Sequence, residues 1–341
     1  MKAWVEKGAW ISKSSRKKLA RITHDSVRKI LVIRHAALGD MLQTRPFLVE
    51  CRRFFPKAHI TLALISNYQL GAPIDLVDQV VVIPGRDQPK INWFDLLRIY
   101  RRMGSFDLLF DLACTSRSLM QSFLTSARFK MGFPYRPKFF LFDVEIFRSE
   151  FNFEAELLLH FLSLLGHQSN YPVTYKLSER TIPLQERNHQ IGYFLSSSNP
   201  HRNYPEAKFL EIILKLSESY PHYEHVIIQG NQAHERFEDL FQELSEKRKV
   251  KNVFLRKPTP LAELQIFLEK LKYLVSNDTG VRHMAIALDT AGIGIFSITI
   301  PFRNRNVHDP KQLCIFEIDG SWPSSVRVLE TIQEHWRSIG I

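Results

Sequence analysis

Three short polar segments of this chain each follow an apolar run, and their side chains suit proton transfer or anion binding. The first is the Leu-Gly-Asp sequence of residues 38–40, just beyond the β-branched run 29–34. A carboxylate at the tip of a strand, where a helix opens, is well placed to act as a general base, so Asp40 is the candidate catalytic residue. The alternative is that Asp40 only caps that helix, because Asp is a favoured N-cap residue.

The second segment, residues 275–283, reads Val-Ser-Asn-Asp-Thr-Gly-Val-Arg-His. A buried strand that enters a polar turn and then a helix exposes the unpaired N–H groups of the first helical turn, and these groups bind phosphate. The candidate anion-binding residues are Asp278, Thr279, Gly280 and His283. The alternative is that Asp278 or Thr279 only caps the helix, and that His283 is a packed core histidine.

The third segment, residues 196–205, follows the first apolar run of the second half of the chain. Arg202 stands just before a Tyr-Pro pair and a helical pattern, and its guanidinium is always charged and suited to a diphosphate. Ser197 lies in the same segment. The alternative is that Arg202 is an ordinary surface arginine.

The sequence lacks the motifs of several enzyme classes. No G-x-G-x-x-G follows a strand, which weakens the case for a dinucleotide dehydrogenase, and no G-x-x-x-x-G-K-[ST] occurs, as a P-loop NTPase would need. No G-x-S-x-G nucleophile elbow occurs either. The spacing of Cys and His suits no zinc site. We interpret the spaced carboxylates Asp75 and Asp78, and Asp107 and Asp111, as edge or cap residues, and we predict no metal site.

Strand-like and helix-like patterns alternate along the chain, which predicts βαβ units and parallel sheets. In such sheets ligands bind beyond the carboxyl ends of the strands, where the three polar segments stand. The predicted strands are 29–34, 59–65, 79–83, 106–112, 191–195, 224–229, 253–255, 273–276 and 292–298.

At 341 residues the chain is longer than one hydrophobic core usually grows, so we expect an α/β protein with two Rossmann-like domains facing across a cleft. The expected parts are a basic N-terminal extension 1–28, a first domain 29–180 and a second domain 181–324. A C-terminal helix, 325–341, is expected to pack back on the first domain.

The formal net charge of +11 indicates a phosphate-bearing partner. Part of the charge lies in the extension, where Trp4 and Trp10 stand among basic residues. Such a segment suits an anionic membrane surface; the alternative is a solvated tail that packs on the domain. Three scattered cysteines and the lack of a membrane-spanning apolar run favour the cytoplasm.

Taken together and in order, these segments resemble glycosyltransferase family 9, the heptosyltransferases that build the lipopolysaccharide inner core. The likeness covers roughly residues 29 to 300, and Arg202 and Tyr204 stand where the family usually has Lys and Trp. It is carried by Gly-Asp at 39–40, Thr-Arg-Pro at 44–46, the strand 106–112, Arg-Asn-Tyr-Pro at 202–205 and Asn-Asp-Thr-Gly-x-x-His-x-Ala at 277–285.

The resemblance implies a GT-B fold and an inverting mechanism that uses neither a metal nor another cofactor. Asp40 corresponds to the family's catalytic base, and Arg202 to its phosphate-binding lysine. The second domain, 181–324, would bind the nucleotide sugar at a site that comprises Ser197, Arg202, Gly230, Asp278, Thr279, Gly280 and His283. The first domain would bind the acceptor, through basic residues at 128–140, namely Arg128, Lys130, Arg136 and Lys138.

The resulting hypothesis is transfer of heptose from ADP-heptose to a lipopolysaccharide inner-core acceptor. The partners would be that donor, a phosphorylated glycolipid and an anionic membrane, at the inner face of the cytoplasmic membrane. The alternatives are a transferase of another nucleotide sugar and a non-catalytic homologue that binds the glycolipid. No nucleic-acid-binding motif supports a nucleic-acid partner.

Overall fold

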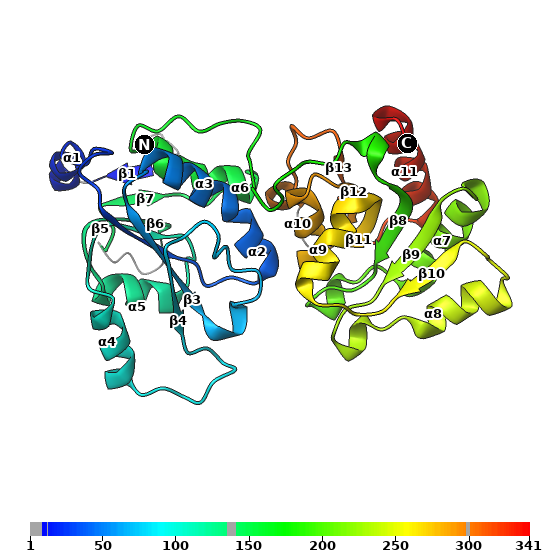
Figure 1. Ribbon diagram of the computed structural model, residues 1–341, viewed down its shortest axis with the longest axis horizontal. Coiled ribbons are helices and arrows are strands. Elements are labelled where there is room, and N and C mark those ends of the chain that lie inside the picture. Colours follow the sequence, from blue (N-terminus) through cyan, green and yellow to red (C-terminus); the bar gives the residue numbers. More distant parts are fainter. Residues whose placement is uncertain (1–8, 12, 135–140, 298–300) are drawn as a thin grey trace. The chain divides into compact units, whose positions relative to one another are not determined.

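The computed structural model describes residues 9–11, 13–134, 141–297 and 301–341. The chain divides into two compact units, Met1–Tyr175 and Lys176–Ile341, a few residues before the boundary that we predicted at 180. Each unit is an α/β layer structure built on a mainly parallel sheet with helices on both faces (Figure 1).

The sheet of the first unit has seven strands in the order β1-β7-β6-β5-β2-β3-β4. All its neighbouring strands run parallel except β1, which is antiparallel to β7. The strands are β1 Ala9–Ile11, β2 Lys29–Ile33, β3 His59–Ile65, β4 Gln79–Ile83, β5 Ser105–Asp111, β6 Ser126–Gly132 and β7 Val144–Ile146. The helices are α1 Lys13–Leu19, α2 Leu38–Gln43, α3 Arg45–Phe54, α4 Trp93–Arg102, α5 Ser116–Leu124 and α6 Glu154–Ser163.

The alternation of side chains along β2 explains why both faces of this sheet are covered. Ile30 and Val32 belong to the core beneath α3 and α6, whereas Leu31 and Ile33 belong to the core beneath α4 and α5. Successive side chains of a strand point to opposite faces, so a continuous apolar run requires a helix layer on each side. Figure 1 shows this arrangement.

The described part of the N-terminal extension packs on the first unit. Strand β1 pairs with β7, and Leu19 and Ile22 pack against the core. Ser15 Oγ and Lys18 Nζ lie 2.8 and 2.9 Å from Asp143 Oδ1. Residues 1–8, which include Trp4, lie outside the described residues.

The second unit has a six-stranded parallel sheet in the order β10-β9-β8-β11-β12-β13. Its strands are β8 Asn188–Phe194, β9 Glu224–Ile228, β10 Val253–Arg256, β11 Leu271–Asn277, β12 Ala291–Ile295 and β13 Gln312–Ile315. Its helices are α7 Glu206–Ser219, α8 Glu238–Gln242, α9 Leu261–Lys270, α10 Gly280–Ala287 and α11 Ser325–Ile339. Within the part of the chain that the structure describes, no helix is both long and apolar enough to cross a membrane.

Helix α11 packs on the second unit. Its expected packing back on the first domain stays a prediction. Its buried side chains Val328, Ile332 and Trp336 belong to the core of the second unit, beside α7 and β13. The Trp336 ring lies 4.9 Å from that of Tyr220 and 5.5 Å from that of Tyr273, between ring centroids. The helix is therefore an integral layer of this unit.

Replacing Trp336 with alanine should lower the free energy of unfolding of the second unit by about 3–5 kcal/mol, the usual cost of removing a large buried aromatic side chain. Urea denaturation would measure the change. Val326→Ala is the matched control, because Val326 lies on the same helix but is 60% exposed, and its effect should stay within about 0.5 kcal/mol. Equal losses for the two variants would contradict this assignment of α11.

Candidate active site

Asp40 lies at the carboxyl end of β2, in the first turn of α2. The N-cap position of α2 is Ala37, so Asp40 is not the helix cap that we considered as the alternative. Its backbone carbonyl accepts hydrogen bonds from Thr44 Oγ1 at 2.8 Å and from Arg34 Nη2 at 3.2 Å. Its side chain is 48% exposed. The backbone of Asp40 is thus held by two hydrogen bonds, while its side-chain carboxylate is open to solvent.

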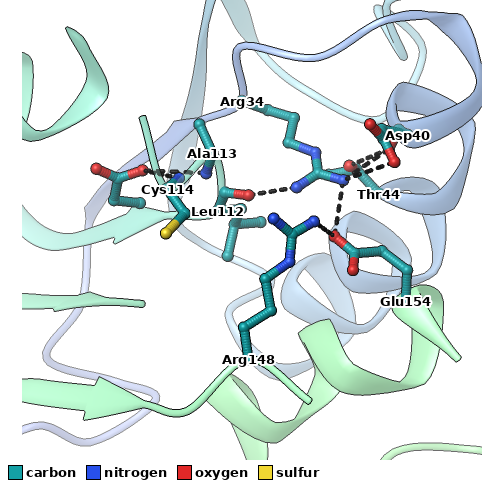
Figure 2. A network of polar contacts seen from close by, with 9 residues as sticks. Arg34, Asp40, Thr44, Leu112, Ala113, Cys114, Arg148 and Glu154 are labelled. Carbon is teal, nitrogen blue, oxygen red and sulfur yellow. Dashed lines mark hydrogen bonds and ion pairs between the residues drawn. The ribbon is translucent and has the colours of Figure 1, made fainter. Parts of the chain in front are cut away.

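Beneath Asp40 lies a buried group of charges (Figure 2). Glu154 Oε1, on α6, accepts hydrogen bonds from Arg34 Nη2 at 3.1 Å and from Arg148 Nη2 at 2.9 Å. Arg34 also donates to the carbonyl of Leu112, at the end of β5. The side chains of Arg34 and Glu154 are 2% and 1% exposed. The Arg34 guanidinium lies 3.9 Å from Asp40 Oδ1, so it also adds positive charge beside the candidate base.

Sequence reasoning missed Arg34, Arg148 and Glu154 as site residues. Arg34 carries a signal, because it is a charged residue at the end of an apolar β-branched run. Such a residue is buried only when it is paired. Nothing local in the sequence indicates that its partner is Glu154.

The loop after β5 is shaped by Asp111, whose side chain is almost completely buried. One carboxylate oxygen accepts from the backbone N–H of Ala113 at 3.0 Å, and the other from Ser122 Oγ at 3.0 Å. Burial raises the pKa of Asp111 above its ordinary value, although these hydrogen bonds act in the opposite direction. Asp111 therefore fixes the loop that offers the Leu112 carbonyl to Arg34.

His35 follows Arg34 and is also buried. Its Nε2 lies 3.0 Å from Gln121 Oε1 on α5. Burial lowers the pKa of His35 to about 4, against the smaller raising effect of the hydrogen bond to Gln121. The ring is therefore neutral near pH 7 and donates from Nε2.

Of the predicted acceptor residues that the structure describes, Arg128 and Lys130, neither is placed beside Asp40. Arg128 pairs with Asp107 at 3.0 Å near the amino ends of β5 and β6, whereas Asp40 lies at the carboxyl end of β2. Lys130 Nζ donates to the Ser122 carbonyl at 2.6 Å, against α5. The physical reason is that residues 126–132 form strand β6 instead of a loop. Arg136 and Lys138 lie outside the described residues.

The other spaced carboxylates bind arginines. Asp75 receives two hydrogen bonds from Arg45, at 2.8 and 2.5 Å, and Asp78 Oδ2 lies 2.5 Å from Arg52 Nη2. Across residues 9–11, 13–134, 141–297 and 301–341, no three His, Cys, Asp or Glu side chains form a group that could hold a metal ion.

In the second unit, three of the predicted residues, Arg202, Asp278 and His283, form a cluster. Strands β8 and β11 are neighbours and parallel, so the loops at their carboxyl ends meet. Asp278 Oδ2 lies 3.7 Å from Arg202 Nη1, on the short 3-10 turn Pro200–Arg202, and Oδ1 lies 3.7 Å from His283 Nε2, on α10. Thr279 is the N-cap residue of α10 and Gly280 is its first residue.

Asp278 is buried among groups that favour its ionised form. Burial by itself raises its pKa, but the hydrogen bond and charge of His283 and the charges of Arg282 and Arg202 act in the opposite direction. The net pKa of Asp278 lies below its ordinary value. Asp278 is therefore a carboxylate that orients cationic and hydrogen-bonding neighbours.

Asn277 connects the two loops and was not among the predicted site residues. Its side chain is fully buried, donates to the Leu195 carbonyl and accepts from the Tyr204 backbone N–H at 3.0 Å. Ser197 Oγ lies 2.9 Å from Asn203 Oδ1, so Ser197 also shapes the loop before Arg202. Its almost complete burial suits this positioning role.

Gly230 lies just beyond the carboxyl end of β9, the strand beside β8. Its N–H donates to the Glu235 carbonyl at 3.1 Å, and the Glu235 side chain lies against it. A side chain at position 230 would collide with that carboxylate, which accounts for the glycine in terms of local packing.

Comparison with known proteins identifies relatives over most of the chain. A family model described as "Glycosyltransferase family 9 (heptosyltransferase)" matches residues 98–327. A protein named lipopolysaccharide heptosyltransferase 1, from Campylobacter coli, is 22% identical over 296 residues, which are 81% of this chain and 86% of that protein.

Two solved structures of the Escherichia coli heptosyltransferase WaaC have the same fold. The structure with ADP has a TM-score of 0.71 at 18% identity, covering 90% of this chain and 99% of that one. The structure with ADP-2-deoxy-2-fluoro heptose has a TM-score of 0.70 at 17% identity, with the same coverage. The α/β GT-B fold predicted from the sequence is thereby confirmed.

Replacing Glu154 with glutamine should lower the free energy of unfolding of the first unit by about 3–5 kcal/mol, because it leaves a buried guanidinium without its counter-charge. Urea denaturation would measure this loss. Asp25→Asn is the matched control: Asp25 pairs with Lys57 at 3.9 Å, but both side chains are mostly exposed, so the loss should stay below about 1 kcal/mol. Similar losses in both variants would refute the role of the buried charges.

The buried His35 should make the first unit less stable in mild acid. Below pH 6.5 the unfolded chain takes up a proton on this residue, whereas the folded chain does so only near pH 4. The stability of the wild type should therefore fall by about 1.4 kcal/mol per pH unit through this window. His35→Gln should flatten that slope in urea denaturation series, whereas His24→Gln, at an exposed histidine, should not. An unchanged slope for His35→Gln would contradict this account.

Proposed function

We propose that this chain, which belongs to glycosyltransferase family 9, moves heptose from ADP-heptose to a lipopolysaccharide inner-core acceptor. Family membership makes it a glycosyltransferase; the donor and the acceptor are our proposal. The name of the Campylobacter coli relative and the ligands in the two WaaC structures support it. The observation that carries it is the cluster of Arg202, Asp278 and His283 at the carboxyl ends of β8 and β11.

On the donor side, Arg202 and the first N–H groups of α10 would bind the diphosphate. Arg202 is 40% exposed, so its guanidinium is accessible to a ligand. An ionised carboxylate repels a diphosphate, so we assign Asp278 an indirect role: it orients Arg202 and His283. The guanidinium and the helix amides would also stabilise the negative charge that develops on the leaving ADP, without help from a metal ion.

On the acceptor side, Asp40 would act as the general base. It would take the proton of the acceptor hydroxyl while that oxygen forms a bond to the anomeric carbon and the bond from this carbon to the diphosphate breaks. A single displacement of this kind inverts the configuration at the anomeric carbon. Arg34 would position Asp40 through its hydrogen bond to the Asp40 backbone carbonyl and through its charge, 3.9 Å from the carboxylate. We place this reaction at the inner face of the cytoplasmic membrane, where a glycolipid acceptor would be held.

The test is release of ADP from ADP-heptose in the presence of a deacylated lipopolysaccharide core. Asp40→Asn should lower acceptor-dependent release by about 100-fold or more, with the affinity for ADP unchanged in calorimetry. Arg202→Ala should weaken ADP binding by about 10- to 100-fold, since it removes a charged hydrogen-bond donor. Arg128→Ala is the control, because Arg128 pairs with Asp107 near the amino ends of the strands, away from Asp40. It should change neither quantity.

The same assay decides between this proposal and its alternatives. Turnover with a different nucleotide sugar would keep the transferase and replace the donor. Tight binding of a nucleoside diphosphate without turnover of any donor would favour a non-catalytic homologue. Absence of nucleotide binding would contradict the proposal as a whole.

A further inference from the structure

Helix α4 exposes large apolar and basic side chains on one surface of the first unit. Its inner side chains Leu96 and Tyr100 are buried in the core beneath the sheet. In its first turn Phe94 is 77% exposed and Trp93 is 49% exposed. We call the set of Trp93, Phe94, Leu97, Arg98, Arg101 and Arg102 the α4 face. Aromatic side chains this exposed indicate a surface that binds something apolar.

The α4 face also carries uncompensated positive charge. Residues 84–103 contain five basic residues and two acidic ones. One of the two, Asp95, already accepts from Asn92 at 2.6 Å and from Arg98 at 3.1 Å. Within the described residues, the structure gives Arg101 and Arg102 no carboxylate partner. The helix thus offers two guanidinium groups for anions, and the exposed Phe94 ring lines the same part of the surface.

Five of these side chains, those of Phe94, Leu97, Arg98, Arg101 and Arg102, line a groove of about 380 Å³. The groove therefore combines an aromatic ring, an aliphatic side chain and three guanidinium groups. A lipid bilayer with anionic head groups offers the complement of both kinds of group, because its phosphates bind arginines and its interface accepts Trp and Phe.

The basic segment at the N-terminus is less suited to the same task. Arg16, Lys17 and Arg21 are exposed, but Leu19 and Ile22 pack against the core of the first unit. These apolar side chains are therefore unavailable for insertion into a membrane. On the described residues, α4 alone of the two helices offers exposed aromatic groups together with arginines.

We propose that the α4 face docks the first unit on an anionic phospholipid bilayer. The direction of the helix fits this role. Its last residue, Arg102, stands just before the amino end of β5, so Trp93 and Phe94 lie about 12–14 Å away, toward the carboxyl ends of the strands, where Asp40 lies. This proposal rests on the proposed function in one respect, namely that the acceptor is a membrane glycolipid.

The experiment is sedimentation of the full chain with vesicles of phosphatidylglycerol and phosphatidylcholine, compared with vesicles of phosphatidylcholine alone. The test variant is R98Q/R101Q/R102Q, which keeps the buried face of α4. The matched control is R16Q/K17Q/R21Q, which removes the same charge from α1 and the turn that follows it. Loss of three arginines near an anionic surface should weaken partitioning by about 100-fold, and the control variant should bind within about threefold of the wild type. Phe94→Ser should weaken binding by about tenfold.

The opposite pattern, in which the α1 variant loses binding and the α4 variant keeps it, would overturn the proposal. Equal binding of the wild type to both kinds of vesicle would overturn it as well. Release of ADP with the water-soluble deacylated core should be the same for the α4 variant and the wild type. If the wild type binds anionic vesicles through α4 but turns over no ADP-heptose, the docking surface stands and the proposed function fails.

Discussion

One buried carboxylate, Glu154, holds together the part of the first unit on which the candidate base depends. It stands between the guanidinium groups of Arg34 and Arg148 with almost no exposure to solvent. A buried charge is tolerated only when it is paired and hydrogen-bonded, so the three side chains have little freedom to move apart. Arg34 also donates to the backbone carbonyls of Leu112 and Asp40, so these contacts join α6, the end of β5 and α2 at the carboxyl ends of the strands.

In both units a buried charged side chain supports a more exposed one, but the signs of the two charges are exchanged. In the first, a buried positive charge supports a half-exposed carboxylate, Asp40. In the second, a buried carboxylate, Asp278, supports the partly exposed Arg202 and a buried His283. In each case the group proposed to meet the substrate is the more exposed member of the pair. The supporting member is buried, where its interactions are screened least by solvent.

Much of this arrangement follows from the sequence. The β-branched apolar run 29–34 predicts a strand buried on both faces, and the rule that ligands bind at the carboxyl ends of parallel strands leads directly to Asp40 and to Asp278. Strand β6 was missed because Arg128 and Lys130 interrupt its apolar pattern; their charges are satisfied by Asp107 and by the carbonyl of Ser122. These hydrogen-bond partners lie outside the segment 126–132, so the pattern of that segment alone does not reveal them.

The pairing of Arg34 with Glu154 was missed for the same reason, and the packing of α11 on the second unit depends on similar distant contacts. An amphipathic helix has an apolar stripe, but the stripe does not specify which core it covers. Trp336 fits among Tyr220, Tyr223 and Tyr273, which come together only when the sheet of the second unit has formed.

The measurement that tests the central claim most directly is the wild-type chain's turnover of a panel of nucleotide sugars with a deacylated lipopolysaccharide core, followed by nuclear magnetic resonance of the product. The account predicts that ADP-heptose is the preferred donor and that the new glycosidic bond has the anomeric configuration opposite to that of the donor. Retention of the donor's configuration would contradict a single displacement assisted by Asp40, and transfer from none of the donors would contradict the assignment of this chain as a heptosyltransferase.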